Sequence, residues 1–399
     1  MVLALRYQET NHLYSSLTLD DPTDLMSGGT ISVDGIEMII PRNTLVTTPN
    51  IAVAWSEMWI DGVVQMPLWP EVSWKASVFG NQLNDSWIVG LVFIIQDPFR
   101  IITGFINEID TATSHFRLGG DSNVPGSGIE MVINDPVGRY GMPYLDNPLW
   151  TSDTDNPSIT SLTGMPMCIQ RPFGNLTDDP LCPTKNRPIR DSDGTAHTMI
   201  QFVTESARGA NDPDPNFFVP LAVGDYVTIT GTQVTDTLLA VFNLIANVGI
   251  YTVPGELPNY IRVQEAQFAI TGPLASETGE TRAVAFTTDP TVSLEWFAMD
   301  VDQCTGATTY RSMLNTAPFA DLAGQIAGET IFRGNKIDFS PATRNVQFRS
   351  VLGTSFTNNS ITAGQCTTPI NGFANGFIFA EITTIGDSEF PLGLLISIH

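Results

Sequence analysis

Apolar and polar residues alternate along most of this chain, and glycine or proline interrupts almost every stretch long enough for a helix. Alternation with a period of two is typical of β-strands that bury one face, whereas a helix needs apolar residues every three or four positions. We therefore expect an all-β protein. The pattern predicts strands at 30–41, 86–96, 100–110, 115–120, 128–135, 225–234, 237–245, 259–270, 283–288, 293–301 and 346–353.

Two long hairpins suggest what the central strands build. Segment 104–120 runs from a strand through a polar loop into a second strand that ends on Gly119 and Gly120, and segment 222–245 begins another hairpin after a Gly-Asp turn. Long strands joined in this way are typical of small barrels. We expect a β-barrel or β-sandwich with OB-like barrel elements, interrupted by a loop-rich insert at 121–220.

The strand pattern also predicts how the chain is divided. An N-terminal β segment with a tryptophan-rich stretch is expected at 1–89, a barrel-like domain at 90–275, and a C-terminal β segment packed on the barrel at 276–399. The best helix candidate is 317–332, where apolar residues recur at helical spacing despite two glycines.

The four cysteines are expected to form two disulfides, Cys168 with Cys182 and Cys304 with Cys366. The sequence alone leaves other pairings open, and four unpaired buried thiols are the alternative. A disulfide between Cys168 and Cys182 would close a short loop inside the insert, which removes about 3 kcal/mol of entropy from the unfolded chain. Its expected role is to pin the insert against the barrel.

The charge and the composition of the chain limit the classes of binding partner and the cellular compartment that we expect. The 42 acidic residues outnumber the 18 basic ones, so a net charge of -24 repels nucleic acid and anionic membranes. Lysine occurs three times, while small and polar residues are plentiful, which is commoner in secreted proteins. Together with the cysteines, this favours secretion or the lumen of the secretory pathway. Asn84, Asn175 and Asn358 begin glycosylation triplets.

The ends and the apolar runs add little to this picture. No apolar run is long enough to span a membrane, and the apolar stub at the N-terminus is too short for a signal peptide. We interpret the sequence as a mature chain behind an added Met. Both a monomer and a homodimer are compatible with it.

Tryptophan and methionine are concentrated in segment 53–74. Trp55 and Trp59 are four residues apart, which would place both on one face of a strand. Rigid aromatic walls suit an apolar ligand pocket, and a core layer closing one end of the barrel is the alternative. The expected pocket residues, from this segment and later ones, are Trp55, Trp59, Trp69, Trp87, Met165 and Trp296.

Familiar catalytic motifs are missing from the sequence. It contains no nucleophile elbow, no His-Glu-x-x-His motif, no P-loop and no dinucleotide fingerprint, and four histidines leave little for a triad or a metal site. We expect neither a metal nor a cofactor. Paired carboxylates keep a glycosidase-like hydrolase or a calcium site open, although such pairs are more often turn residues. The pairs are Asp153 with Asp155, Asp191 with Asp193, Asp212 with Asp214, and Asp300 with Asp302.

Six runs of the sequence stand out: INDPVGRYG (133–141), DTDNPSITSLTGMPMCIQRP (153–172), DDPLCPTKNRP (178–188), FVPLAVGDYVTITG (218–231), PNYIRVQEAQFAI (258–270) and FAMDVDQCTG (297–306). Together they resemble a large family of fungal secreted β-rich proteins. The resemblance covers roughly residues 90 to 370 and is most specific around Cys168 and Cys182.

We expect the family that the chain resembles to include the cofactor-free hetero-Diels-Alderases of fungal tropolone-sesquiterpenoid biosynthesis, on xenovulene-type and epolone-type pathways. This resemblance implies a pericyclase that joins a tropolone o-quinone methide to a humulene-type sesquiterpene. Such a reaction needs small apolar substrates held face to face, exclusion of water, and a hydrogen bond to the heterodiene oxygen.

Five side chains are candidate donors for that hydrogen bond. Tyr226, Tyr251 and Arg171 are the expected catalytic donors, and Tyr144 and Arg190 are further candidates. Two other classes of protein stay open: a secreted carbohydrate-binding or cell-wall protein, and a glycosidase-like hydrolase that uses paired carboxylates.

Overall fold

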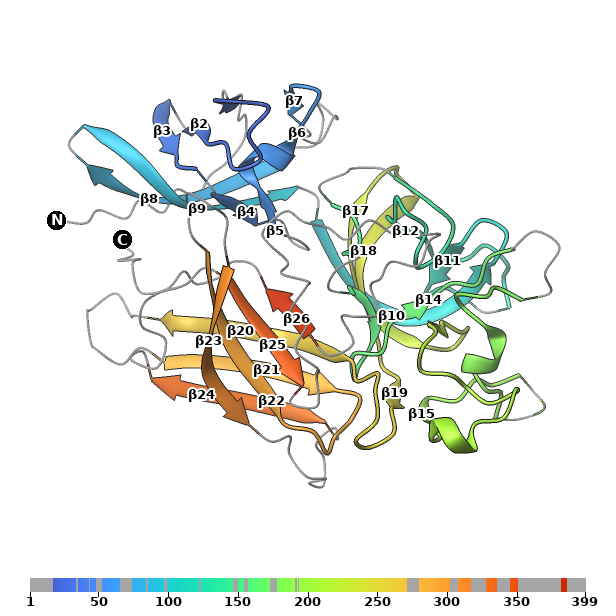
Figure 1. Ribbon diagram of the computed structural model, residues 1–399. Coiled ribbons are helices and arrows are strands. Elements are labelled where there is room, and N and C mark those ends of the chain that lie inside the picture. The colour runs from blue at the N-terminus through green and yellow to red at the C-terminus, as the bar shows by residue number, and fades with distance from the viewer. Residues whose placement is uncertain are drawn as a thin grey trace.

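The computed structural model describes most of the chain, and within these ranges the expected all-β class is confirmed. Figure 1 shows three groups of strands, and the helical elements of this described part are three short 3-10 turns, η1 (Trp55–Met58), η2 (Thr184–Asn186) and η3 (Glu205–Ala207). The described residues are 17–33, 35–42, 44–47, 52–64, 74–83, 85–96, 99–121, 123–145, 150–153, 157–172, 178–190, 192, 194–270, 280–301, 308–316, 328–335, 345–350 and 382–385.

The N-terminal part is a seven-stranded sheet, blue to cyan in Figure 1. Its long strand β9 pairs with β8 in an antiparallel hairpin and with β3 and β4 in parallel. A small hairpin of β6 (Trp59–Ile60) and β7 (Val63–Val64) follows η1. The sheet strands are β1 (Leu17–Leu19), β2 (Gly29–Val33), β3 (Ile36–Ile40), β4 (Leu45–Thr47), β5 (Ala52–Ala54), β8 (Trp74–Leu83) and β9 (Ser86–Gln96).

Five central strands close into a barrel, at the right of Figure 1. The first three form an antiparallel meander, the fourth pairs with the first, and the fifth closes the ring by pairing in parallel with the third. This strand order, 1-2-3-5-4-1, is that of the OB barrel, as the hairpins predicted. The strands are β10 (Phe99–Asp110), β11 (His115–Leu118), β12 (Ile129–Ile133), β17 (Tyr226–Gln233) and β18 (Leu238–Ala246).

Strand β18 contributes to two cores because of a β-bulge. Between the pairs Thr230–Asn243 and Gly231–Val241 there is one extra residue, Phe242. Val241 belongs to the barrel core, whereas Phe242 is buried in the core of the N-terminal sheet. Glycine is required at position 231 because a Cβ there would lie 2.5 Å from a carbonyl oxygen of β18.

The insert connects β12 to β17 and therefore covers 134–225, later than the expected 121–220, because β12 itself is a barrel strand. It contributes β13 (Ile159–Ser161), β14 (Met167–Cys168), β15 (Met199–Gln201) and β16 (Val219–Pro220), and β19 (Gly249–Tyr251) follows the barrel. Strand β13 extends the β18 edge in parallel, while β14 pairs with β16 and β15 with β19. Insert side chains share one core with the barrel interior.

The C-terminal part, yellow to red in Figure 1, consists of two sheets that share a core around Trp296, Phe332 and Phe348. One sheet has the order β20-β21-β24 and the other β23-β22-β25-β26. Their strands are β20 (Ile261–Ile270), β21 (Glu280–Thr287), β22 (Leu294–Val301), β23 (Thr308–Thr316), β24 (Glu329–Asn335), β25 (Asn345–Ser350) and β26 (Ile382–Ile385).

The sheet pairings put the boundaries between the three parts of the chain at other residues than the expected 89/90 and 275/276. All of β9 belongs to the N-terminal sheet because its partners are there, and β20 belongs to the C-terminal part because it pairs with β21. The helix expected at 317–332 is wrong at its C-terminal end, since residues 329–332 begin β24 and pair with β21. The rest of that segment lies outside the described residues.

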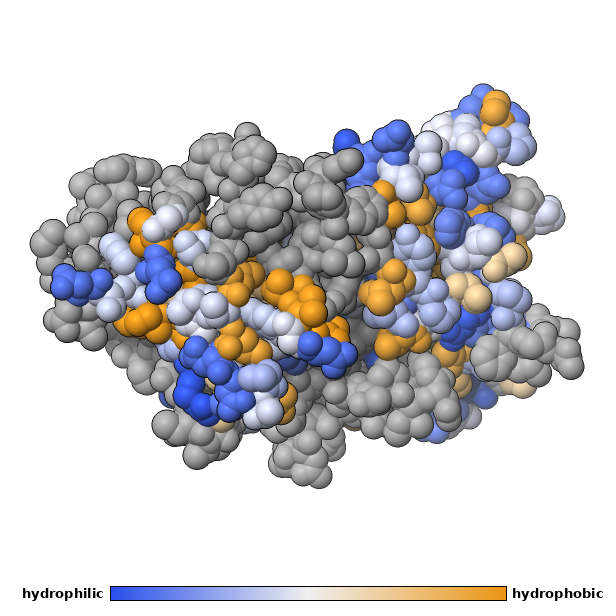
Figure 2. Space-filling model, turned by 90° about the horizontal axis from the view of Figure 1, so that it is seen from above, coloured by the Kyte–Doolittle hydropathy of each residue, from blue (hydrophilic) through white to orange (hydrophobic). Residues whose placement is uncertain are grey.

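Apolar side chains also remain on the surface. Figure 2 shows apolar residues in small groups between hydrophilic ones, over both the N-terminal sheet at the left and the barrel at the right. Scattered exposed apolar residues are normal for a folded protein, so a functional surface has to be argued from particular contacts.

Candidate functional site

Three of the tryptophans expected in a pocket lie together in the N-terminal core. Trp55 is fully buried, its ring centroid is 5.0 Å from that of Trp59, and Trp87 packs against the same cluster. Trp55 and Trp59 were expected on one face of a strand. This expectation is wrong, because Trp55 begins a 3-10 turn. The Glu57 carboxylate accepts a hydrogen bond from the Ala54 backbone N–H (2.6 Å) and stabilises that turn.

The other expected pocket residues lie in different cores. Met165 is fully buried in the barrel core, and Trp296 is stacked on Phe348 in the C-terminal core with ring centroids 5.0 Å apart. Trp69 lies outside the described residues. The structure therefore divides these side chains among three clusters, and the burial of Trp55, Met165 and Trp296 agrees with the core role given above as the alternative.

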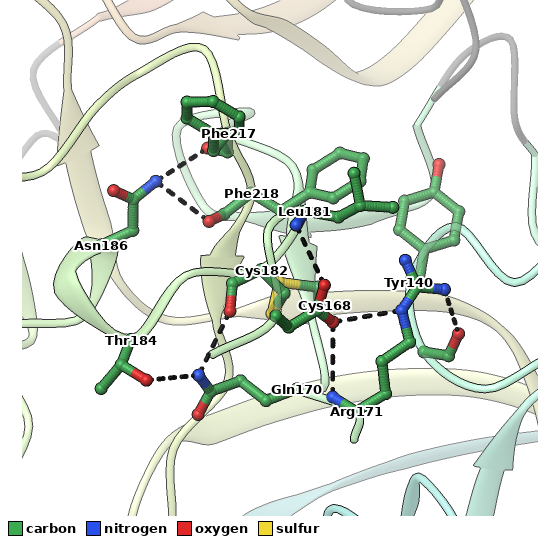
Figure 3. Close-up of a disulfide and its surroundings, with 12 residues drawn as sticks. Tyr140, Cys168, Gln170, Arg171, Leu181, Cys182, Thr184, Asn186, Phe217 and Phe218 are labelled. Carbon is green, nitrogen blue, oxygen red and sulfur yellow. Dashed lines mark hydrogen bonds and ion pairs between the residues drawn. A yellow bond between two sulfur atoms is a disulfide. The ribbon is translucent and has the colours of Figure 1, made fainter. Parts of the chain in front are cut away.

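The disulfide between Cys168 and Cys182 is present and lies at the centre of the insert, with Cα atoms 6.1 Å apart (Figure 3). The Gln170 side-chain amide donates to the Cys182 carbonyl (3.2 Å) and to the Thr184 hydroxyl (2.7 Å). The backbone N–H of Leu221 donates to the Cys168 carbonyl (2.8 Å). The disulfide is thus built into a hydrogen-bonded frame. Cys304, Cys366 and the glycosylation triplets at Asn84, Asn175 and Asn358 lie outside the described residues.

Asn186 completes this frame on the other side of the disulfide. Its amide donates to the backbone carbonyls of Asp214, Phe217 and Phe218 at 2.9, 3.0 and 3.1 Å, and two of these bonds are visible in Figure 3. Its side-chain oxygen accepts a hydrogen bond from the Asp214 backbone N–H (2.8 Å). One buried amide therefore fixes the chain that leads back to the barrel.

Arg171, one of the expected catalytic donors, belongs to the same frame. Its Nη1 donates to the backbone carbonyls of Gly138 and Gly141, and its Nε lies 3.1 Å from a carboxylate oxygen of Asp179. The guanidinium therefore holds the loop of residues 138–141 against the disulfide loop (Figure 3). The Nη1 and Nε atoms of Arg171 therefore contact other parts of the protein.

Tyr226, the second expected donor, lies on the outer surface of the barrel. It is 40% exposed, and its ring meets that of Phe105, itself 60% exposed, in a T-shaped contact of 5.0 Å. Ile101 on the same face of β10 and Val223 before β17 are also exposed. We call these four residues the barrel ledge.

The further donor candidates lie elsewhere in the insert. Arg190 is exposed and contacts the Thr198 hydroxyl at 3.4 Å, and the backbone N–H of Tyr144 donates to the Asp135 carbonyl at 2.9 Å. The structure does not gather the five donors into one group.

The outer face of β11 and β12, where OB barrels commonly bind their ligands, carries an ion-pair network. Arg117 lies between Glu130 (2.6 Å) and Glu108 (3.9 Å), and His115 contacts the other oxygen of Glu130 at 2.7 Å. The hydrogen bond from His115 is the largest cause that lowers the pKa of Glu130. The charged groups on this face are engaged with one another.

The paired carboxylates act as turn residues wherever the structure describes both members. Asp212 accepts a hydrogen bond from the Gly209 N–H (2.7 Å), and Asp214 pairs with Arg208 (2.9 Å) and accepts from Asn216. Asp155, Asp191, Asp193 and Asp302 lie outside the described residues. Within the described ranges, no group of three or more His, Cys, Asp or Glu residues has the arrangement of a metal site.

Met165 and Tyr251 lie on two elements that are fixed to each other. The Thr163 hydroxyl donates to the Ile250 carbonyl (2.6 Å) and accepts from the Ile250 N–H (3.1 Å), which ties the turn of residues 161–165 to β19. The Ser161 hydroxyl accepts from the Met165 N–H (3.0 Å) and closes the turn. Two expected site residues therefore border the same junction, although the Met165 side chain points into the barrel core.

Arg262, on β20, meets that turn and was missed by the sequence reasoning. Its Nε donates to the Leu162 carbonyl (2.8 Å), and its guanidinium carbon lies 4.4 Å from the centre of the Phe286 ring. Position 164 must be glycine, because its φ is +106° and a Cβ there would lie 2.9 Å from the backbone nitrogen of Arg262. Burial lowers the pKa of Arg262 to about 10.

Comparison of the chain with protein-family models, with curated proteins and with solved structures found no match. The resemblance to the fungal family therefore stays a prediction. In the part of the chain that the structure describes, none of the helical turns has the length and hydropathy of a membrane-spanning helix.

Proposed function

We propose that the protein is a cofactor-independent hetero-Diels-Alder cyclase that joins a tropolone o-quinone methide to a humulene-type sesquiterpene. In this cycloaddition one C–C bond and one C–O bond form together, two π bonds become σ bonds, and no proton or electron is exchanged with the protein. The protein has to orient two reactants, exclude water and stabilise charge on the heterodiene oxygen. Orientation alone can contribute about 7–11 kcal/mol.

The observation that carries the proposal is the junction of the insert with β20. The turn of residues 161–165 is fixed to β19 through Thr163, and it meets a buried arginine that lies over the Phe286 ring. Such a junction offers a cationic donor, an aromatic face and a rigid backbone close together, and ligand sites commonly form where separate parts of a chain meet. A guanidinium donor suits an oxygen that gains negative charge during the reaction.

The remainder of the insert supports the same proposal by fixing this junction. The disulfide, the Asn186 amide and the Arg187–Asp225 ion pair hold the insert on the barrel without relying on exposed contacts. Rigid support for a site matters because reactants that are displaced by about 1 Å lose a large part of the orientation effect.

The direct test uses the secreted full chain, humulene and a tropolone quinone methide released in solution from a precursor. We expect the dihydropyran adduct to form faster with the protein than without it, at the expense of the hydrated quinone methide, as measured by chromatography with mass detection. Heat-unfolded protein is the control. An adduct yield that is the same with folded protein, with unfolded protein and with buffer contradicts the proposal.

A second function, carbohydrate binding, is favoured by the barrel ledge. Phe105 and Tyr226 present two exposed ring surfaces at an angle, and Thr103 and Thr228 lie two register pairs along the same face of the sheet. Aromatic faces next to hydroxyls suit neutral sugar rings. We expect binding to insoluble glycans in a pull-down assay to fall in Phe105→Ala and to persist in Ile129→Ala, an exposed control. Equal binding of both variants contradicts this second function.

A further inference from the structure

The buried arginines of the described residues differ in one respect. Arg139 lies beside the Asp135 carboxylate and Arg187 pairs with Asp225, so each buried positive charge has a negative neighbour. Arg262, only 8% exposed, has no acidic partner among the described residues. Its contacts there are one backbone carbonyl and one aromatic ring.

This arrangement is costly in the absence of a ligand. A buried charge without a counter-charge is strongly unfavourable, and the ring and the carbonyl compensate only a part of the lost hydration. The Nη2 atom of Arg262 is buried and makes no hydrogen bond, which is also true of Nε and Nη1 of Arg187. Arg187 has an acidic partner, whereas Arg262 combines an unpaired buried donor with the lack of an acidic partner among the described residues. Buried polar groups are nearly always paired in folded proteins, so this combination points to a binding partner.

We infer that Arg262 is a ligand-binding residue whose Nη2 donates to a single oxygen of a small organic ligand, of the conjugated-carbonyl or enolate class. Nε and Nη2 form one edge of the guanidinium, and Nε already donates to the Leu162 carbonyl. On this edge only the Nη2 donor is left for a ligand, which suits a single oxygen better than the two oxygens of a carboxylate. Phe286 covers one face of the guanidinium, so a ligand oxygen has to approach in its plane.

The ligand has to enter at the contact between the turn and β20. Nη2 is closed off from solvent in the unliganded protein, and Gly164 brings the turn against the backbone of Arg262 and Ile261. Binding therefore includes a small movement of the start of β20 away from the turn of residues 161–165, while Thr163 keeps that turn fixed to β19. A larger residue at position 164 would hold the two apart and disturb both strand and turn.

The inference deepens the proposed function and names the oxygen chemistry of that same site. The heterodiene oxygen of a tropolone quinone methide is a conjugated carbonyl oxygen, and a hydrogen bond from a cation withdraws electron density from the diene. The test below measures binding to the full chain without any turnover, so its outcome does not depend on catalysis.

The experiment uses thermal unfolding and calorimetric titration with three probes. Tropone carries one strongly polarised conjugated carbonyl, cycloheptatriene has the same ring without oxygen, and benzoate offers two carboxylate oxygens. We expect tropone to raise the melting temperature of the wild-type protein, with a smaller effect of benzoate and none of cycloheptatriene. In Arg262→Met we expect tropone affinity to fall roughly 10- to 100-fold, the effect of a hydrogen bond to a charged group.

A second readout separates a binding role from a structural one. Without ligand, Arg262→Met should melt no lower than the wild type, because the substitution removes a buried charge that has no acidic partner in the described part of the chain. The control Arg187→Met should melt much lower, because it leaves Asp225 buried without its partner. An Arg262→Met variant that is as unstable as Arg187→Met, or that keeps its affinity for tropone, overturns the inference, and so does a wild-type protein that does not bind tropone.

The two proposals fail separately. Tropone binding that depends on Arg262, together with no cycloaddition, contradicts the proposed function and leaves the inference standing. Cycloaddition by a wild-type protein whose affinity for tropone is unchanged in Arg262→Met contradicts the inference and leaves the proposed function standing.

Discussion

The ion pair between Arg187 and Asp225 fixes the middle of the insert to its last residue, directly before β17, and we expect its disruption to unfold the insert. The two side chains are 4% and 2% exposed, and the second carboxylate oxygen of Asp225 accepts a hydrogen bond from the Ala222 N–H (2.9 Å). In Arg187→Met, Asp225 keeps that single backbone donor and stays buried. Leaving one charge of a buried pair without its partner costs about 3–5 kcal/mol.

The same variant should become more sensitive to pH. Burial raises the pKa of Asp225 above its ordinary value of 3.8, and the guanidinium of Arg187 opposes that shift. A carboxyl group whose pKa is raised in the folded state binds a proton more readily in the folded protein than in the unfolded chain. It therefore stabilises the folded protein at low pH, and this contribution is lost as the pH rises. The stability difference between Arg187→Met and the wild type should therefore be larger at neutral pH than in acid.

Urea unfolding followed by tryptophan fluorescence measures both effects. The double variant Arg187→Met/Asp225→Asn should recover part of the loss, since it removes the buried charge along with its partner. Arg42→Met is the matched control, because the Arg42 and Asp24 side chains are 56% and 24% exposed, and exposed pairs contribute about 0–1 kcal/mol. A loss in Arg187→Met that is no larger than in Arg42→Met would refute this reasoning.

Three further predictions concern the disulfide, the bulge and the barrel surface. Replacing Cys168 and Cys182 together with alanine should lower the free energy of unfolding by about 3 kcal/mol in urea titrations, given their separation of 14 residues, and a loss below about 1 kcal/mol contradicts this. Phe242→Ala should cost about 3–5 kcal/mol by the same measurement, because a buried ring is lost from the N-terminal core, and an unchanged urea midpoint contradicts that packing. The hydrogen bond with His115 lowers the pKa of Glu130 below 4.5, so ionised Glu130 stabilises the folded protein above that pH, and this contribution is lost as the pH falls through the lowered pKa. In Glu130→Gln the melting temperature should therefore fall less steeply as the solution is acidified. A dependence of the melting temperature on pH that is the same as in the wild type contradicts this prediction.

The features that could be predicted from the sequence are mostly local. Both barrel hairpins connect neighbouring strands, so alternation and turn residues indicate them directly, and the short spacing of Cys168 and Cys182 favours their pairing. The pattern could not show that β18 also pairs in parallel with β12, because that contact depends on how the whole sheet closes. Nor could it place Phe242 in a second core, since a bulge shifts one residue out of the alternation.

The candidate site was harder to predict because its contacts are distant in sequence. Arg262 and Leu162 are 100 residues apart, and an arginine between two apolar residues of a strand normally points to solvent. Among the described residues, the insert turn covers Arg262 on that face of β20. The tryptophans were misleading for a related reason: their abundance predicts aromatic walls, but their distribution between two separate cores depends on tertiary packing.

The central claim is that the folded chain orients a heterodiene and an alkene for cycloaddition next to Arg262. The most direct measurement is the ratio of enantiomers in the dihydropyran formed from humulene and the tropolone quinone methide, with the wild-type protein and with Arg262→Met. Our account predicts one dominant enantiomer with the wild type and a slower, less selective reaction with the variant. A racemic adduct formed at the uncatalysed rate in the presence of the wild-type protein would contradict it.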